Sequence, residues 1–158
     1  RIDVAMSGRM GVELQPKDMT QWEKEQVRKA VGEYKTYLRP VVQFGEQYRL
    51  VSPYDGLNVA SLMYVSPDKS EAAFFWWRLD EMCDDHLPRV KMDGLNPDAL
   101  YCIKEINVID DKPLPFDGKT FSGRFLMECG LEIPPIHNCP VEIRGNNSSR
   151  VLFLELCK

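Results

Sequence analysis

The chain changes its pattern at Gly45, and this change restricts the fold more than any other feature of the sequence. Before Gly45, apolar residues recur at the spacing of a helix, whereas after it short apolar runs alternate with turn-forming pairs. Short strands without helical segments between them are typical of antiparallel sandwiches and barrels. We therefore expect a mainly β fold, in which an antiparallel β-sandwich follows one long helix.

The helix has a clear start and a clear apolar stripe. Thr20 and Glu23 have the spacing of a capping box, in which each side chain accepts a hydrogen bond from the backbone of the other. The apolar residues that recur at helical spacing are Val27, Val31, Tyr34 and Leu38. Pro40 is expected to end the helix, because the residue before a proline avoids helical dihedral angles. The sequence predicts a helix over residues 20–38 whose stripe packs on the sandwich or on another chain.

Apolar runs bounded by turn formers predict the strands. They cover residues 48–51, 59–65, 72–79, 89–92, 100–108 and 151–157. Pairs such as Asp55 with Gly56 and Asp93 with Gly94 favour tight turns between them. Residues 121–131 fit either a strand or a helix. The last strand is apolar at nearly every position, so we expect it near the centre of its sheet.

Residues 1–14 form an apolar stretch that lacks partners nearby in the sequence. Ile2, Val4 and Met6 predict a buried strand, which a turn follows. Natural N-termini are usually polar and loosely ordered, so we expect the chain to be a piece of a longer protein whose targeting signals can lie upstream of Arg1. Uncovered strand edges and apolar surfaces seek partners, so this piece is expected to self-associate.

Charge and hydropathy exclude two classes of partner. The net charge of the 158 residues is −4, and no run of basic residues interleaved with aromatic ones occurs, so we expect no nucleic-acid partner. The longest apolar run lies near residues 72–77, which is far shorter than the roughly 20 residues of a membrane-spanning helix. We therefore expect no membrane partner.

Residues of the catalytic and metal-binding kinds are few and poorly placed. The five cysteines are irregularly spaced, which favours free, buried thiols over a disulfide framework. His86 and His137 lie in turn-like segments that contain prolines, and their spacing from Cys83 and Cys139 matches no standard zinc site. Residues 7–11 contain a glycine pair but lack the phosphate-loop pattern. We expect no metal ion, cofactor or catalytic residue in this chain.

The most unusual local feature is the run of residues 74–77, Phe-Phe-Trp-Trp. Side chains alternate between the two faces of a strand, so Phe74 and Trp76 are expected to enter the core while Phe75 and Trp77 face the other side. An outward aromatic pair is either covered by another part of the protein or free to stack on a sugar ring. Phe75 and Trp77 are therefore our candidates for a sugar or interface contact.

Several motifs occur in an order that carries a family resemblance. Residues 8–14 (GRMGVEL) precede the predicted helix, and residues 45–50 (GEQYRL) follow it. Residues 94–97 (GLNP) and the Ser122-Gly123 pair come later in the chain. In this order they resemble the tail of family 36 glycoside hydrolases, the bacterial α-galactosidases, in which the last strand and helix of a barrel lead into a C-terminal sandwich.

The resemblance implies a fold and a function for a longer protein. Residues 1–44 would be the last strand and helix of a (β/α)8 barrel, and residues 45–158 the C-terminal antiparallel β-sandwich domain. The two catalytic aspartates would lie upstream of Arg1, so no catalytic residue is assigned here, and Glu13 would have a structural role. The longer protein would be a retaining α-galactosidase that acts on terminal α-galactosides without a cofactor, and the partner of this chain would be its missing barrel.

The acidic pairs of the chain do not replace the missing aspartates. Glycoside hydrolysis uses two carboxylates on opposite sides of the scissile bond, and adjacent residues in a turn do not provide that geometry. We expect these pairs to be solvated: Asp80 with Glu81, Asp84 with Asp85, and Asp110 with Asp111.

Two alternatives stay open at this point. The longer protein can be specific for another α-linked sugar, such as N-acetylgalactosamine, because the residues that select the sugar would lie in the barrel. The chain can also be a free-standing, non-catalytic β-sandwich that binds carbohydrate or protein. The compartment stays open between the bacterial cytoplasm and the periplasm.

Overall fold

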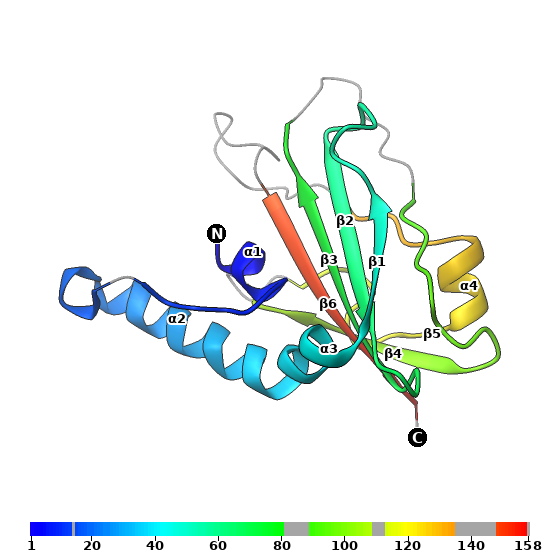
Figure 1. Ribbon diagram of the computed structural model, residues 1–158, viewed down its shortest axis with the longest axis horizontal. Helices are drawn as coiled ribbons and strands as arrows, with labels where there is room; N and C mark the ends of the chain where they lie inside the picture. Colours follow the sequence, from blue (N-terminus) through cyan, green and yellow to red (C-terminus); the bar gives the residue numbers. More distant parts are fainter. Residues whose placement is uncertain (14, 81–88, 109–112, 135–147, 158) are drawn as a thin grey trace.

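A six-stranded antiparallel sheet organises the computed structural model, which describes residues 1–13, 15–80, 89–108, 113–134 and 148–157 (Figure 1). The order of the strands across the sheet is β1-β2-β3-β6-β4-β5. Their bounds are Glu46–Val51 (β1), Val59–Val65 (β2), Glu71–Arg78 (β3), Leu100–Ile106 (β4), Thr120–Ser122 (β5) and Ser148–Leu156 (β6). Each of these lies close to a predicted strand or, for β5, in the segment that fitted either structure.

The last strand occupies the middle of the sheet, as its sequence predicts. β6 pairs with β3 on one side, where Phe74 lies opposite Leu152, and with β4 on the other side, where Ile103 lies opposite Leu154. Residues Val151 to Leu154 are all buried, because the sheet is covered on both faces. A strand that is covered on both faces loses the alternation of apolar and polar residues that a half-exposed strand shows.

One face of the sheet is covered by a helical layer that precedes it in the chain. This layer contains α1 (Ile2–Met6), the short 3-10 turn η1 (Pro16–Asp18), α2 (Gln21–Glu33), the π-helical turn η2 (Tyr34–Leu38) and α3 (Arg39–Phe44). The capping box is confirmed, since Glu23 N–H donates to Thr20 Oγ1 at 3.2 Å and Thr20 N–H donates to Glu23 Oε2 at 2.7 Å. The N-terminal half of α2 extends past the edge of the sheet (Figure 1).

The prediction that Pro40 ends the helix is wrong. The turn before it widens into a π turn, in which Arg39 N–H donates to the carbonyl of Tyr34 five residues earlier. Pro40 then lies in the first turn of α3, where the missing N–H of a proline leaves no bond unmade. The widened turn keeps Tyr34 and Leu38 buried against the sheet, as the apolar stripe predicts, while Val27 and Val31 are half-buried.

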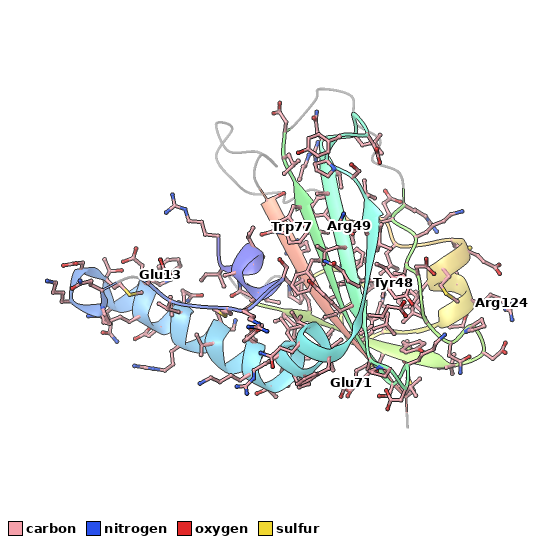
Figure 2. All side chains as sticks on the ribbon, in the orientation of Figure 1. Glu13, Tyr48, Arg49, Glu71, Trp77 and Arg124 are labelled. Carbon is pink, nitrogen blue, oxygen red and sulfur yellow. The ribbon has the colours of Figure 1, made fainter. Side chains whose placement is uncertain are left out.

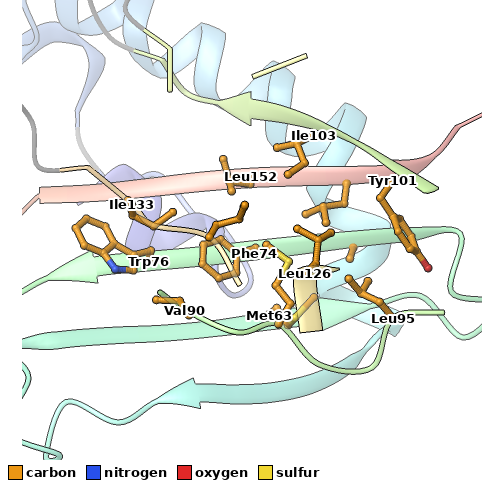
Figure 3. Close-up of a cluster of buried hydrophobic side chains, with 14 of the residues drawn as sticks. Met63, Phe74, Trp76, Val90, Leu95, Tyr101, Ile103, Leu126, Ile133 and Leu152 are labelled. Carbon is orange, nitrogen blue, oxygen red and sulfur yellow. The ribbon is translucent and has the colours of Figure 1, made fainter. Parts of the chain in front are cut away.

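The other face of the sheet holds the larger part of the core. Side chains from the sheet, such as Met63, Phe74 and Trp76, pack against residues of α4 (Gly123–Glu128) and of irregular segments (Figure 3). The apolar residues that these segments contribute are Val90, Met92, Leu95, Leu114, Leu126, Leu131 and Ile133.

The expected second sheet of a sandwich is absent from the described residues. The predicted strand 89–92 makes a single bridge, between Val90 and Leu131. The physical reason lies in the turns, because Gly94 and Gly130 have positive φ angles of 75° and 70° that interrupt extended backbone. The segments next to these turns therefore pack on the sheet as loops and as α4 rather than as a second layer of strands, while β4 and β5, which lie between the two turns, belong to the six-stranded sheet itself.

The strand predicted within residues 1–14 is also wrong. Ile2–Met6 forms the helix α1, which lies beside β6. A helix satisfies its own backbone groups, whereas a strand needs a neighbour, and no described strand pairs with this segment. Met6 is buried, but Val4 is 59% exposed, so α1 covers the sheet with one side and leaves an apolar side uncovered.

Candidate functional site

The aromatic run on β3 divides its side chains between the two faces of the sheet, as predicted. Phe74 and Trp76 join the core under α4, and Phe75 and Trp77 lie on the face that the helical layer covers. Phe75 is fully buried there, with its ring 5.9 Å from that of Trp77 in a stacked arrangement and 6.3 Å from that of Tyr64. Phe75 is therefore an interface contact between the sheet and the helices of this chain.

Trp77 lies on β3 near the end of the sheet (Figure 2), where it borders a hollow. The hollow has a volume of about 500 Å³ and is lined by residues in or next to α1, β3 and β6: Arg1, Val4, Trp77, Arg78, Leu79, Ser148 and Ser149. The indole Nε1 of Trp77 is buried and makes no hydrogen bond with the described residues. Because this N–H is buried, the indole offers the hollow its ring rather than its polar atom, and such a ring can pack on an apolar group or stack on a sugar.

A buried carboxylate fixes α1 beside this hollow. Asp3 Oδ1 accepts from Asn107 Nδ2 at 2.6 Å, and Asp3 Oδ2 accepts from Ser149 Oγ at 2.7 Å. Asn107 N–H in turn donates to Glu33 Oε2 of α2 at 2.8 Å. Asn107 follows β4 and has a φ of 57°, a conformation that asparagine tolerates better than most residues. Both oxygens of Asp3 are thus engaged in holding elements together.

A second buried carboxylate has a similar structural role. Glu105 on β4 accepts from Arg150 Nη1 at 2.8 Å and from the N–H of Leu114. Burial raises the pKa of the Glu105 carboxyl, while the Leu114 N–H and the Arg150 guanidinium act in the opposite direction. Glu105 N–H donates to Asp117 Oδ1 at 2.7 Å. The network joins β4, β6 and the segment before β5, and it lines none of the hollows described here.

The acidic pairs and both histidines fall largely outside the described residues. Asp80 is exposed, and its predicted neighbours are not described: Glu81, Asp84, Asp85, Asp110 and Asp111. His86, His137, Cys83 and Cys139 also lie outside. Within the described ranges, no three His, Cys, Asp or Glu residues lie close enough together to hold a metal ion. No described helix is long and apolar enough to cross a membrane.

The described cysteines are free, but the prediction that they are buried is wrong. Cys102 is half-buried, and Cys129 and Cys157 are exposed. Cys129 follows the last residue of α4 and Cys157 follows the last residue of β6. Positions just beyond the end of an element lie at the surface more often than those within it.

The glycine pair of residues 7–11 forms a turn that is held by two tyrosines. Tyr64 Oη donates to the carbonyl of Ser7 at 2.8 Å, and Tyr34 Oη donates to the carbonyl of Gly8 at 2.8 Å. These contacts engage carbonyl oxygens, whereas a phosphate loop offers N–H groups. The sequence predicted that Tyr34 lies on the apolar stripe, but it did not reveal the hydroxyl contact, which joins residues 26 positions apart.

Glu13 is exposed near α2 (Figure 2).

Comparison with protein families gives one match. Residues 59–154 match the glycosyl hydrolase family 36 C-terminal domain, a segment that runs from the first residue of β2 into β6 and includes most of the sheet. The chain belongs to glycosyl hydrolase family 36. The resemblance drawn from the motifs is thereby confirmed, including its assignment to the C-terminal part of the family.

Individual relatives agree with this family. The chain is 37% identical over 115 residues to alpha-galactosidase AgaA of Geobacillus stearothermophilus. This alignment covers 73% of the chain and 16% of that protein. It is 41% identical over 101 residues to alpha-galactosidase 1 of Pediococcus pentosaceus, an alignment that covers 64% of the chain and 14% of that protein. It is 33% identical over 130 residues to probable alpha-galactosidase C of Aspergillus terreus, an alignment that covers 82% of the chain and 15% of that protein.

Solved structures of family 36 share the fold over almost the whole chain. The crystal structure of alpha-galactosidase AgaB from Geobacillus stearothermophilus aligns with 99% of the chain at a TM-score of 0.80 and 31% identity, using 19% of that protein. The structure of the alpha-galactosidase from Lactobacillus brevis also aligns with 99% of the chain, at a TM-score of 0.81 and 30% identity, and the alignment covers 20% of that protein. The chain therefore spans about one seventh to one fifth of the length of these family 36 proteins.

Proposed function

We propose that this chain is the C-terminal part of a retaining α-galactosidase and that it braces the catalytic barrel of that protein. The observation that carries the proposal is the alignment of 99% of the chain with a solved α-galactosidase. The TM-score of this alignment is 0.80 and the sequence identity is 31%. The chain contributes packing surface rather than chemistry, because the two carboxylates that are buried among the described residues, Asp3 and Glu105, are engaged in holding elements together.

The division of labour follows from the mechanism of such enzymes. In retaining hydrolysis one carboxylate attacks the anomeric carbon of a terminal α-galactoside while a second protonates the leaving oxygen, and water then releases the sugar. Both aspartates of this pair belong, in the proposal, to the barrel upstream of Arg1. Residues 1–44 form the end of that catalytic domain, and residues 45–158 form the C-terminal domain. The change from α3 to β1 at Gly45 supports this boundary.

The proposed activity is tested by assaying the chain beside the full-length protein on a nitrophenyl α-galactoside. We expect turnover by the full-length protein and none by the chain alone, because orientation of the sugar and both carboxylates are needed to lower the barrier. Turnover by the chain within a few-fold of the full-length rate would contradict the proposal. A parallel assay with the nitrophenyl α-N-acetylgalactosaminide decides between the two sugars.

The alternative function is a free-standing module that binds carbohydrate or protein. Trp77 supports it, because the indole borders an open hollow, and aromatic rings stack on sugars. A start codon close to Arg1 in the reading frame would favour this module, whereas a barrel-sized extension upstream favours the enzyme.

The chain on its own is further proposed to self-associate. Its uncovered apolar residues on the helical layer, such as Val4 and Trp22, are each 59% exposed, and such surfaces promote association. Light scattering over a range of concentrations tests this, and a monomer at every concentration would contradict it.

A further inference from the structure

The junction between the helical layer and the sheet contains another hollow, which has a volume of about 410 Å³. It is lined by residues just after α1, by the end of α3 and by one residue of β2: Gly8, Arg9, Val42, Gln43, Phe44 and Tyr64. α3 leads directly into β1 at this junction (Figure 1). A hollow of this size lies in the range of small-molecule sites in proteins. We call it the Phe44 hollow.

Phe44 provides an open aromatic surface at this hollow. It is the last residue of α3, and 75% of its surface is exposed. The backbone that carries its ring is fixed, because Gly45 N–H donates to the carbonyl of Val41 at 2.8 Å. The missing side chain of Gly45 also lets the chain pass close to the carbonyl of Val65. An aromatic ring that is held in this way and left uncovered is suited to stacking on a flat ligand.

Two polar side chains beside the ring are unengaged. Among the residues that the structure describes, the Arg9 guanidinium and the Gln43 carboxamide make no hydrogen bond or ion pair, and both side chains are exposed. Tyr64 differs from them, because its hydroxyl donates to the carbonyl of Ser7 at 2.8 Å and accepts from Gln47 Nε2 at 3.2 Å. Tyr64 is therefore a fixed wall of the hollow, whereas Arg9 and Gln43 have donors and an acceptor to offer a ligand.

These groups together select the chemistry of the occupant. An apolar partner over Phe44 would also cover the guanidinium and the carboxamide, and burying such groups without hydrogen bonds costs free energy. A strongly anionic ligand would meet one cation, since Arg9 is the single charged side chain among the described residues that line the hollow. A sugar ring suits both parts, because its C–H face covers an aromatic ring while its hydroxyl groups bond to the arginine and the glutamine.

We propose that the Phe44 hollow is an additional, non-catalytic binding site for a galactopyranoside. The choice of galactose among the sugars rests on the proposed function, which places galactosides around the full-length protein. The axial 4-hydroxyl of galactose leaves three C–H bonds on one side of the ring, which gives Phe44 an apolar face to stack on. The site differs from the hollow beside Trp77, with which it shares no lining residue.

Hydroxyl-radical footprinting of the full-length protein tests the proposal. We expect Phe44 to be oxidised without sugar, and galactose at about 20 mM to lower this oxidation roughly threefold relative to Tyr54, given a Kd on the order of 1 mM for one stacked ring. Tyr54 is the internal control, because it is 95% exposed and does not line the hollow. Equal losses at Phe44 and Tyr54 overturn the proposal. A Phe44 that is unreactive before sugar is added shows that the rest of the protein covers the hollow, and this result also overturns it.

A variant and a second probe make the measurement specific. In the full-length Gln43→Ala variant, we expect the galactose concentration for half-maximal protection of Phe44 to rise roughly threefold or more, since one hydrogen-bonding group is lost. Gln15→Ala is the matched control, because Gln15 is exposed and lies outside the hollow, and it should change nothing. An unchanged midpoint in Gln43→Ala overturns the proposal.

Galactitol has the hydroxyl groups of galactose without its ring, so it should protect Phe44 far less, and equal protection by the two compounds overturns the stacked arrangement. The proposed function fails separately from this site. Protection of Phe44 by galactose without hydrolysis of galactosides rejects the proposed function alone, whereas hydrolysis without protection rejects the site alone.

Discussion

Glu105 lies in the core, where among the described residues Arg150 is the cation that pairs with it. Its side chain is 2% exposed, and that of Arg150 is 15% exposed. The Arg150 Nε makes no hydrogen bond with the described residues, so the bond from Nη1 to Glu105 is its main compensation. A buried pair of this kind adds little net stability, but the loss of one partner leaves an uncompensated charge.

We therefore expect Glu105→Gln to lower the free energy of unfolding by about 3 to 5 kcal/mol, measured by urea denaturation. The control is Asp98→Asn, which removes an ion pair with Arg124 whose side chains are 80% and 56% exposed. That change should cost less than about 1 kcal/mol, because exposed pairs are screened by water. Equal losses from the two variants would show that Arg150 is compensated in another way.

Asp68 gives a pH dependence that is set by a turn. Ser66 Oγ and Ser70 Oγ each donate to Asp68 Oδ1 at 2.7 Å in the turn between β2 and β3. These bonds hold the pKa of Asp68 at about 2, below its ordinary value of 3.8. Because the folded pKa is the lower one, the stabilisation is complete above pH 3.8 and is lost as the pH falls through 2.

The Asp68→Asn variant should therefore be less stable than the parent chain at pH 5, and the difference should shrink between pH 4 and pH 2. Urea midpoints measured across this range give the difference directly. A constant difference would mean that the hydrogen bonds to Asp68 do not depend on its charge. Asp98→Asn, at an exposed carboxylate whose partner lies in α4, is the control for general effects of charge.

At the scale of elements, the junction of α3 with β1 depends on the absence of a side chain. A Cβ at Gly45 would collide with the backbone carbonyls of Val41 and Val65, neither of which can move without disturbing α3 or β2. Gly32, one residue before the end of α2 and ahead of the helical turn η2, has open space around it. The two glycines thus predict opposite outcomes for the same substitution.

Gly45→Ala should lower the free energy of unfolding by about 1 to 3 kcal/mol through overpacking. Gly32→Ala should raise it by about 0.5 to 1 kcal/mol, since alanine restricts the unfolded chain and favours a helix. Thermal unfolding of both variants beside the parent chain measures the two changes. A stabilising Gly45→Ala would contradict the contact described at the junction.

The sequence predicted the elements whose signals are local and missed those that depend on neighbours. Thr20 and Glu23 lie three residues apart, so the start of α2 could be predicted within one residue. The continuation of the helix past Pro40 could not, because it depends on a π turn whose buried residues, Tyr34 and Leu38, pack on a distant sheet. The alternation along β3 predicted the two faces of the aromatic run, but not what would cover each of them.

For the whole molecule, the placement of the two candidate site residues was predicted in part, while their role as a sugar or interface contact stays a prediction. Phe75 and Trp77 were assigned to one face from their spacing alone, and they lie there. The covering of Phe75 by helices that precede it in the chain could not be inferred, because the sequence does not say which face a helix will choose. The hydrogen bonds of Asp3 join residues more than 100 positions apart, and no local pattern reports such contacts.

The sheet as a whole depends on β6, since β3 and β4 meet only through it. We expect a chain of residues 1–134 to lack cooperative unfolding, as measured by circular dichroism, and a peptide of residues 148–158 to restore it. The same peptide with Leu152→Asp is the control and should fail, because Leu152 is buried against both neighbours. Cooperative unfolding of residues 1–134 alone would show that the two parts of the sheet are independent.

This arrangement also has a consequence for the order in which a ribosome delivers the fold. Every other strand leaves the ribosome before β6, so during synthesis the facing edges of β3 and β4 are complete but unpaired. Both strands are rich in apolar residues, and unpaired edges of this kind invite pairing with other chains. The interval between the release of β4 and the release of β6 is thus the time at which a nascent chain is most exposed to aggregation and to chaperones. Synonymous codons that slow translation between residues 107 and 147 should lengthen that interval and lower the yield of folded protein.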